Sequence, residues 1–191
     1  MIKIGKNISS FSTYSCKPIT KHELKNLIEK RISHEGPKCD LNDIDVSLIE
    51  DMSYLFYKSA FNGDISKWNV SNVTNMYSMF ACSKFNGDIS DWNTSNVKFM
   101  GWMFAQSEFN KDISEWNTSN VKYMEWMFSR SIFNGDISNW DVSNVEDMEC
   151  IFRESDFNQD ISNWNIQNCN TIRMFADCPI KEEYKSKSLQ K

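Results

Sequence analysis

Proline and glycine are scarce in this sequence, with three and six residues of each among 191. Disordered and low-complexity chains are rich in these residues and poor in aromatics. This chain is instead 14% aromatic and 40% apolar. The composition excludes a disordered chain and favours a single folded body with one sizeable core.

Long hydrophobic runs are missing as well. Residues 1–10 lack the apolar stretch that a secretory signal needs, and no later stretch is long enough to cross a membrane. The six cysteines form no C-x-x-C pair and have no nearby histidine to complete a metal site. We therefore expect a cytoplasmic protein in a reducing compartment, with the cell surface as the alternative if a leader was removed.

Histidine is rarer still, since only His22 and His34 occur. A Ser-His-Asp or Cys-His catalytic arrangement therefore has little to work with. Phosphate-binding glycine loops are absent too, because Gly63, Gly87 and Gly135 are single turn glycines. We predict a protein that is not an enzyme and that has no cofactor.

Charge is unevenly distributed. Residues 1–36 carry a net charge of +4, residues 37–180 carry −11 and residues 181–191 carry +2, within a total of −5. Binding to a phosphate backbone requires clustered lysine and arginine, so the acidic middle argues against direct nucleic-acid contact. A basic or nucleic-acid-binding protein suits this charge better as a partner.

A 24-residue phrase, F-N-G-D-I-S-x-W-N-x-S-N-V-x-x-M-x-x-M-F-x-x-S-x, repeats along the chain, and a fixed period of this length indicates a solenoid. Its I-S-x-W segment alternates like a short strand, and Met76, Met79 and Phe80 follow the i, i+3, i+4 spacing of a short helix. We therefore predict an α/β repeat solenoid, leucine-rich-repeat-like, with about six coils that each hold a short strand and a short helix. The expected coils are 37–60, 61–84, 85–108, 109–132, 133–156 and 157–180, of which the first is degenerate and the last is one residue short.

Both ends of such a stack need a cap. Residues 20–23 form a capping box, Leu24 and Ile28 lie on one helical face, and Gly36 and Pro37 end the helix. Residues 1–36 are therefore predicted to be an N-terminal segment with a capping helix. Residues 181–191 form a polar tail, so we expect the C-terminal end to be closed poorly or by a partner, with homo-oligomerisation there as one alternative.

Polar columns recur as regularly as the apolar ones. Aspartate repeats at 64, 88, 112, 136 and 160, which could form a ladder of calcium ligands. Asparagine and aspartate also bond the backbone of turns, and the chain lacks a G-G-x-G-x-D calcium repeat. We favour the turn interpretation and predict no metal site.

The phrases W-N-V-S-N-V-T-N-M at 68–76 and F-N-G-D-I-S-x-W followed by M-F resemble the BspA-like surface-protein repeats, also described as the DUF285 or Mycoplasma/Listeria lipoprotein repeat family. The resemblance covers roughly residues 37–180. It implies a bacterial leucine-rich-repeat group whose members are often surface-anchored, and hence a role in interaction instead of chemistry. This chain lacks a lipobox cysteine after a signal peptide and a wall-anchoring tail.

The repeat breaks its consensus on one surface. In the two central coils, the residue just before the first methionine of M-x-x-M-F is aromatic: Phe99 and Tyr123. The residue two positions after that methionine is aromatic as well: Trp102 and Trp126. On a helical wheel these aromatics point outward, and Gln106 and Arg130 continue the stripe. Acidic residues of the next coil flank it: Glu146, Asp147 and Glu149.

This stripe has the composition of a protein-interface hot spot, although packing between neighbouring helices would explain it equally well. The acidic flank could steer a basic partner or could be a solvated face. We predict a non-catalytic protein-protein interaction module. A narrower hypothesis is an inhibitor of a bacterial host nucleic-acid enzyme or defence system, and the alternative is a fragment of a surface adhesion protein.

Overall fold

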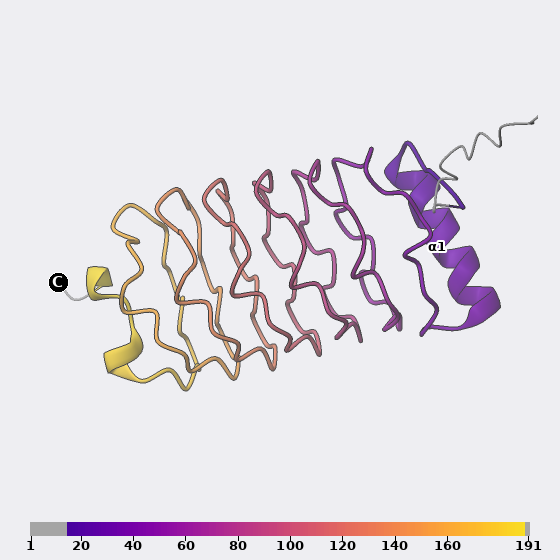
Figure 1. Cartoon of the computed structure of the whole chain (residues 1–191). Coiled ribbons are helices and arrows are strands. Elements are labelled where there is room, and N and C mark those ends of the chain that lie inside the picture. The colour runs from indigo at the N-terminus through magenta and orange to yellow at the C-terminus, as the bar shows by residue number, and fades with distance from the viewer. Residues whose placement is uncertain (1–14, 190–191) are drawn as a thin grey trace, which may run out of the picture.

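The chain winds into a row of stacked coils with one helix at its N-terminal end (Figure 1). The computed structural model describes residues 15–189. Its helical elements are α1 (Lys21–Glu35), η1 (Glu182–Tyr184) and η2 (Lys187–Leu189). Neither α1 nor the two short helices is long and apolar enough to cross a membrane.

Helix α1 is present where the capping box predicted a helix. The hydroxyl of Thr20 accepts a hydrogen bond from the N–H of Glu23 at 3.2 Å, and the Glu23 carboxylate accepts one from the N–H of Ile19 at 2.9 Å. The helix ends at Gly36, whose φ of 89° is available to glycine at little cost. Leu24 is fully buried, so α1 packs its apolar face on the core of the stack.

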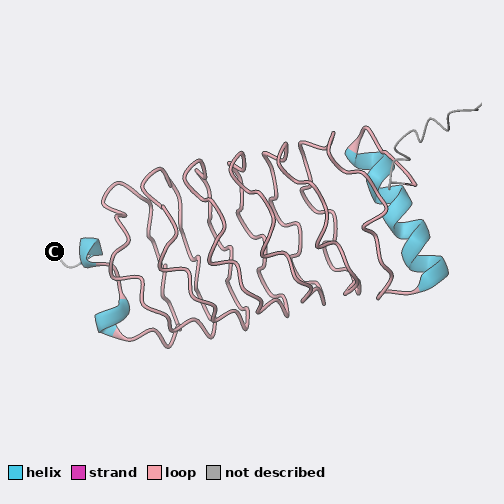
Figure 2. Cartoon of the chain, in the orientation of Figure 1, coloured by secondary structure: helices cyan, strands magenta, loops and turns pink. Residues whose placement is uncertain are grey.

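The predicted α/β leucine-rich-repeat-like architecture is wrong. Within residues 15–189 there is no β-strand, and the coils contain no helix (Figure 2). Neighbouring coils are joined by isolated parallel bridges between single residues, such as Asn75 to Phe99 and Phe99 to Tyr123. The last bridge joins Asp147 to Asn170, so the final coil is one residue short, as the sequence indicated.

Consecutive turns replace the expected helix in each coil. The N–H of Met103 donates to the carbonyl of Met100 at 3.2 Å, and Trp102 between them has a φ of 59°. A positive φ at the third residue, with a negative one at the second, is the signature of a type II turn. The N–H of Met100 donates to the carbonyl of Tyr123 in the next coil, so the backbone bonds run between coils instead of along a helix.

These turns also explain why the sequence looked helical. Each turn advances the chain by three residues and returns the next side chain to the interior. Met100, Met103 and Phe104 are therefore all buried, with the same i, i+3, i+4 spacing that a helix face shows. The apolar period alone cannot distinguish the two conformations.

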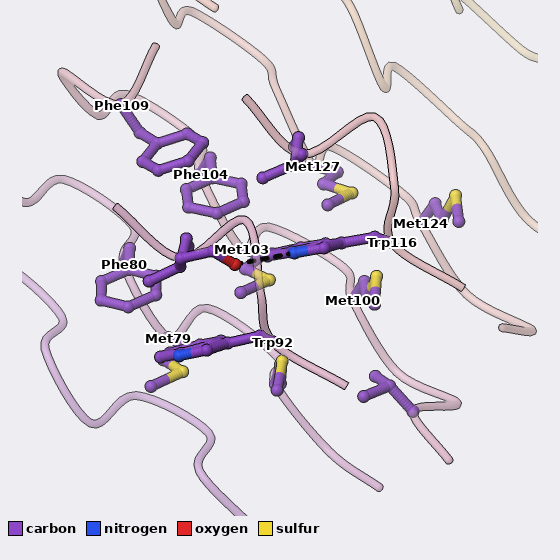
Figure 3. Packing of buried hydrophobic residues seen from close by; sticks show 14 of the residues in the cluster. Met79, Phe80, Trp92, Met100, Met103, Phe104, Phe109, Trp116, Met124 and Met127 are labelled. Atoms are coloured by element: carbon purple, nitrogen blue, oxygen red, sulfur yellow. Dashed lines mark hydrogen bonds between the residues drawn. The ribbon is translucent and has the colours of Figure 1, made fainter. Parts of the chain in front are cut away.

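The core consists of columns of identical side chains stacked across the coils. The rings of Phe80 and Phe104 are 5.6 Å apart and nearly parallel, and those of Trp92 and Trp116 are 6.5 Å apart (Figure 3). The indole N–H of Trp116 donates to the carbonyl of Ile89 at 3.0 Å, and the other four core tryptophans make the equivalent bond. Every buried polar atom of the indole column is thus satisfied.

The polar columns hold the turns, as the turn interpretation predicted. Asp112 Oδ1 accepts the N–H of Ser114 at 2.9 Å, and the same bond recurs along the aspartate column. Asn110 Oδ1 accepts the N–H of Asn134 at 3.0 Å, which links adjacent coils. Among residues 15–189 no group of three or more His, Cys, Asp or Glu side chains is placed to hold a metal ion.

The segment after the last coil folds back on it. The N–H of Ile161 donates to the carbonyl of Tyr184 at 2.9 Å, and the hydroxyl of Ser186 donates to the carbonyl of Trp164 at 2.6 Å. Ser186 is fully buried by these contacts. The polar tail therefore covers part of the C-terminal end, which was expected to lack its own cover; residues 190 and 191 lie outside the described part of the chain.

Candidate functional site

Two stacked aromatic pairs lie on the outer face of the central coils. The rings of Phe99 and Tyr123 are 5.4 Å apart with an interplanar angle of 2°. Those of Trp102 and Trp126 are 4.8 Å apart with an angle of 12°. Phe99 is 40% exposed and the other three rings are half-buried. The structure therefore brings together the four predicted aromatics, although they stand on turns and not on helices.

These pairs are not required by the core. In the flanking coils the position of Phe99 and Tyr123 is held by Asn75 and Asp147, and the coils stack there with the same bridge. The position of Trp102 and Trp126 is held by Ser78 and Cys150, with the same positive φ. A positive φ is unfavourable for a bulky residue. The same positive φ recurs at this position in every coil, so it is a feature of the repeat and gives no evidence of strain specific to this site.

Gln106 and Arg130 occupy the next column, also with positive φ, and both are exposed. Arg130 forms a two-pronged ion pair with Glu154, at 2.8 Å from Nε and 3.2 Å from Nη2. This pair raises the pKa of Arg130 and lowers the pKa of Glu154, chiefly through the side-chain hydrogen bonds. Arg130 is therefore already engaged within the chain.

The predicted acidic flank is partly neutralised. Glu146 accepts a hydrogen bond from the Tyr123 hydroxyl at 3.5 Å and forms an ion pair with Lys122 at 3.2 Å. Asp147 Oδ1 accepts the N–H of Glu149 at 2.7 Å. Glu149 is half-buried and has no ion pair with the described residues. Of the three acidic residues, Asp147 thus bonds a turn, whereas Glu146 stays exposed beside Lys122.

Sequence reasoning missed one neighbour of the aromatic pairs and a further ring pair in the first two coils. The guanidinium carbon of Arg153 lies 5.5 Å from the ring centre of Trp126 and covers the face that Trp102 does not. Tyr54 and Tyr77 form a further ring pair at 5.6 Å in the first two coils. Tyr54 occupies the same column as Trp102. Extending the comparison of this column to the degenerate first coil would therefore have identified Tyr54 from the sequence.

Gly101 leaves a gap in the column that precedes the tryptophans. That column reads Ser53, Tyr77, Gly101, Glu125 and Glu149. The Glu125 carboxylate fills the gap, and a Cβ atom on Gly101 would collide with Oε1 of Glu125. Oε2 of Glu125 is buried without a hydrogen-bond partner in residues 15–189. Burial raises the pKa of Glu125, and the negative charges of Asp147 and Glu149 raise it further.

The family comparison gives a match over most of the chain. A family model described as "Mycoplasma protein of unknown function, DUF285" matches residues 23–131 and 105–187. No curated protein and no solved structure matches the chain.

Proposed function

The chain belongs to the DUF285 family of Mycoplasma proteins of unknown function, and we propose that it is a non-catalytic module that binds another protein. The stacked pair Trp102 and Trp126 carries the proposal. These two rings lie outside core columns that are already complete, and tryptophan is among the residues enriched at the energetic centre of protein interfaces. Phe99 and Tyr123 extend the same surface.

A catalytic role has little support in the arrangement of side chains. His22 and His34 are both exposed on α1, which lies at the N-terminal end of the stack (Figure 1). The aromatic face belongs to the central coils. No group of metal ligands is found in the described coils. The proposal therefore assigns the face to binding and includes no cofactor and no direct contact with nucleic acid.

The test is loss of partner capture by the double variant Trp102→Ala and Trp126→Ala. Wild type and variant are used as affinity baits in a lysate of the source organism, and bound proteins are identified by mass spectrometry. We expect the variant to lose the partner, because each removed ring is worth roughly 2 kcal/mol of binding at an interface centre. Circular dichroism and melting should remain close to wild type.

Leu48→Ala with Ile132→Ala provides the matched control. Both side chains are exposed, at 49% and 47%, and neither lies in the aromatic columns. The control should retain the partner. Equal capture by the tryptophan variant and by wild type would refute the assignment of this face.

We place the module in the cytoplasm in this proposal, supported by six cysteines that form no disulfide. The alternative is a surface adhesion role, which the family resemblance favours. Protease treatment of intact and lysed cells, followed by detection of the chain, separates the two locations. The narrower hypothesis of an inhibitor of a nucleic-acid enzyme is supported by the acidity of residues 37–180, and it requires such an enzyme among the captured proteins.

A further inference from the structure

One face of the tryptophan pair is already occupied by a guanidinium group of the same chain. Trp126 is sandwiched between the ring of Trp102 and the guanidinium of Arg153. Arginine stacks on tryptophan because its planar, weakly hydrated cation is attracted to the electron-rich ring face. The pair therefore has one end that carries a cation and one end that does not.

The end without a cation is the face of Trp102 turned toward the coil 61–84. The two indoles are nearly parallel, so the second face of Trp102 is directed away from Trp126. The equivalent residue in that coil is Ser78, which has no ring to stack there. Tyr77 pairs with Tyr54 instead, and in the described chain no other ring or cation packs on this face of Trp102.

The Glu125 carboxylate lies next to the backbone that precedes Trp102. Glu125 reaches over Gly101, the residue that immediately precedes Trp102, and one of its oxygens is buried with no donor. A buried carboxylate that lacks a donor carries a desolvation cost, which a cation placed against it would offset. In the part of the chain that the structure describes, none of the lysines or arginines forms an ion pair with Glu125.

We propose that Trp102 and Glu125 form a subsite for an arginine side chain of the partner protein, with the guanidinium stacked on Trp102 and bonded to Glu125. This inference rests on the proposed function and specifies the chemistry that the aromatic face recognises. Arginine suits the subsite better than lysine because one planar group can stack on the ring and donate to the carboxylate at the same time. The Arg153 contact with Trp126 shows the same stacking within the chain.

The test uses short peptides, so that it does not depend on knowing the partner. The probes are acetyl-Gly-Arg-Gly-amide and the same peptide with citrulline, which keeps the shape of arginine and removes the charge. Binding is followed by the indole N–H signals of the full chain in two-dimensional NMR. Five of the seven indole groups are locked in hydrogen bonds to backbone carbonyls, so the signals of Trp102 and Trp126 report on the surface.

We expect the arginine peptide to shift the Trp102 signal with a dissociation constant of roughly 1–10 mM, as suits one cation–π contact and one ion pair. The citrulline peptide should bind at least fivefold more weakly. Glu125→Gln should weaken the arginine peptide at least fivefold, whereas Glu115→Gln, which removes an exposed carboxylate elsewhere, should leave binding unchanged. Equal binding of the two peptides, equal binding by Glu125→Gln and wild type, or no shift of the Trp102 signal would each overturn the subsite.

A stability measurement guards against a folding artefact. Glu125→Gln should melt at or above the wild-type temperature, because it removes an unsatisfied charge, so weaker peptide binding cannot be attributed to unfolding. If the Trp102 and Trp126 variant loses the native partner while the peptides fail to discriminate, the protein-binding function stands and the arginine subsite is wrong. If the native partner is kept but the peptides discriminate, the subsite exists and the proposed role of the face in partner binding is wrong.

Discussion

The indole N–H of Trp116 donates to the carbonyl oxygen of Ile89, 27 residues earlier and 3.0 Å away. This bond crosses from one coil to the preceding one. Removing the donor destabilises the fold by more than the net contribution of the hydrogen bond, because the carbonyl oxygen stays buried without water or another partner. The tryptophan column therefore holds neighbouring coils together by hydrogen bonding as well as by ring packing.

Trp116→Phe should lower the free energy of unfolding by about 2 kcal/mol, because the Ile89 carbonyl is left without a donor and part of the ring volume is lost. Trp116→Ala should cost about 4 kcal/mol through the larger cavity. Urea denaturation followed by circular dichroism measures both. Trp102→Phe is the control, since that indole makes no hydrogen bond with the described residues, and it should cost less than about 0.5 kcal/mol. A similar loss at both positions would contradict the role of the bond.

Asn110→Ala should destabilise the chain by about 1 kcal/mol, because the N–H of Asn134 loses its acceptor in the neighbouring coil. Asn139 is exposed and its side chain makes no hydrogen bond with residues 15–189, so Asn139→Ala should stay within about 0.5 kcal/mol of wild type. Thermal melting of the two variants gives the comparison. Equal melting temperatures would show that the asparagine ladder contributes nothing to stability.

Gln106→Gly should be more stable than Gln106→Ala by about 1 kcal/mol, because the residue at this position has a φ of 54°. The side chain is exposed, so little packing is lost in either variant. The same pair of substitutions at Lys111, which is exposed and has no positive φ, should favour alanine instead. Denaturant midpoints of the four variants decide the matter, and a preference for alanine at 106 would contradict the turn geometry.

Glu125 makes stability depend on pH. Its pKa is raised by burial above the ordinary value of 4.5, so the folded state binds the proton more tightly than the unfolded state. Below 4.5 both states are protonated and the side chain carries no penalty; as pH rises through the folded-state pKa, this contribution to stability is lost. Glu125→Gln should therefore match wild type at low pH and exceed it by about 1 kcal/mol at neutral pH.

Denaturant unfolding of wild type and Glu125→Gln across this pH range measures the difference. Glu115→Gln is the matched control, and its stability should run parallel to wild type at every pH. A constant offset between Glu125→Gln and wild type would mean that the carboxylate is as well solvated in the folded state as in the unfolded one.

The inward residues and α1 could be predicted from the sequence, and the backbone conformation of the coils could not. The 24-residue spacing of Phe80, Phe104 and Phe128 correctly placed identical rings in one column. The spacing of Met100 and Met103 was assigned to a helix because turns of three residues give the same apolar period. What distinguishes the two is the positive φ of Trp102, and nothing in a tryptophan residue indicates a left-handed conformation.

The candidate site was predictable in part. A break in the repeat consensus identified Trp102 and Trp126, because packing keeps the core columns uniform and leaves the surface columns free to vary. Arg153 and Glu125 were missed because their roles depend on which neighbour lies across the coil boundary. The gap at Gly101 is visible in the sequence only once Glu125 is known to stand directly next to it in the following coil.

The hydrogen bonds between coils have a consequence for how such a chain evolves. Each coil presents to the next one the same row of donors and acceptors that it received from the previous one. Unequal recombination that duplicates residues 109–132 would therefore insert a complete coil without disturbing either side, and lengthen the stack by about 4.8 Å. A duplication of that coil would also add a third tryptophan to the outer pair. Each such duplication would thus change the gene length, the number of coils and the size of the aromatic face together, by one coil at a time.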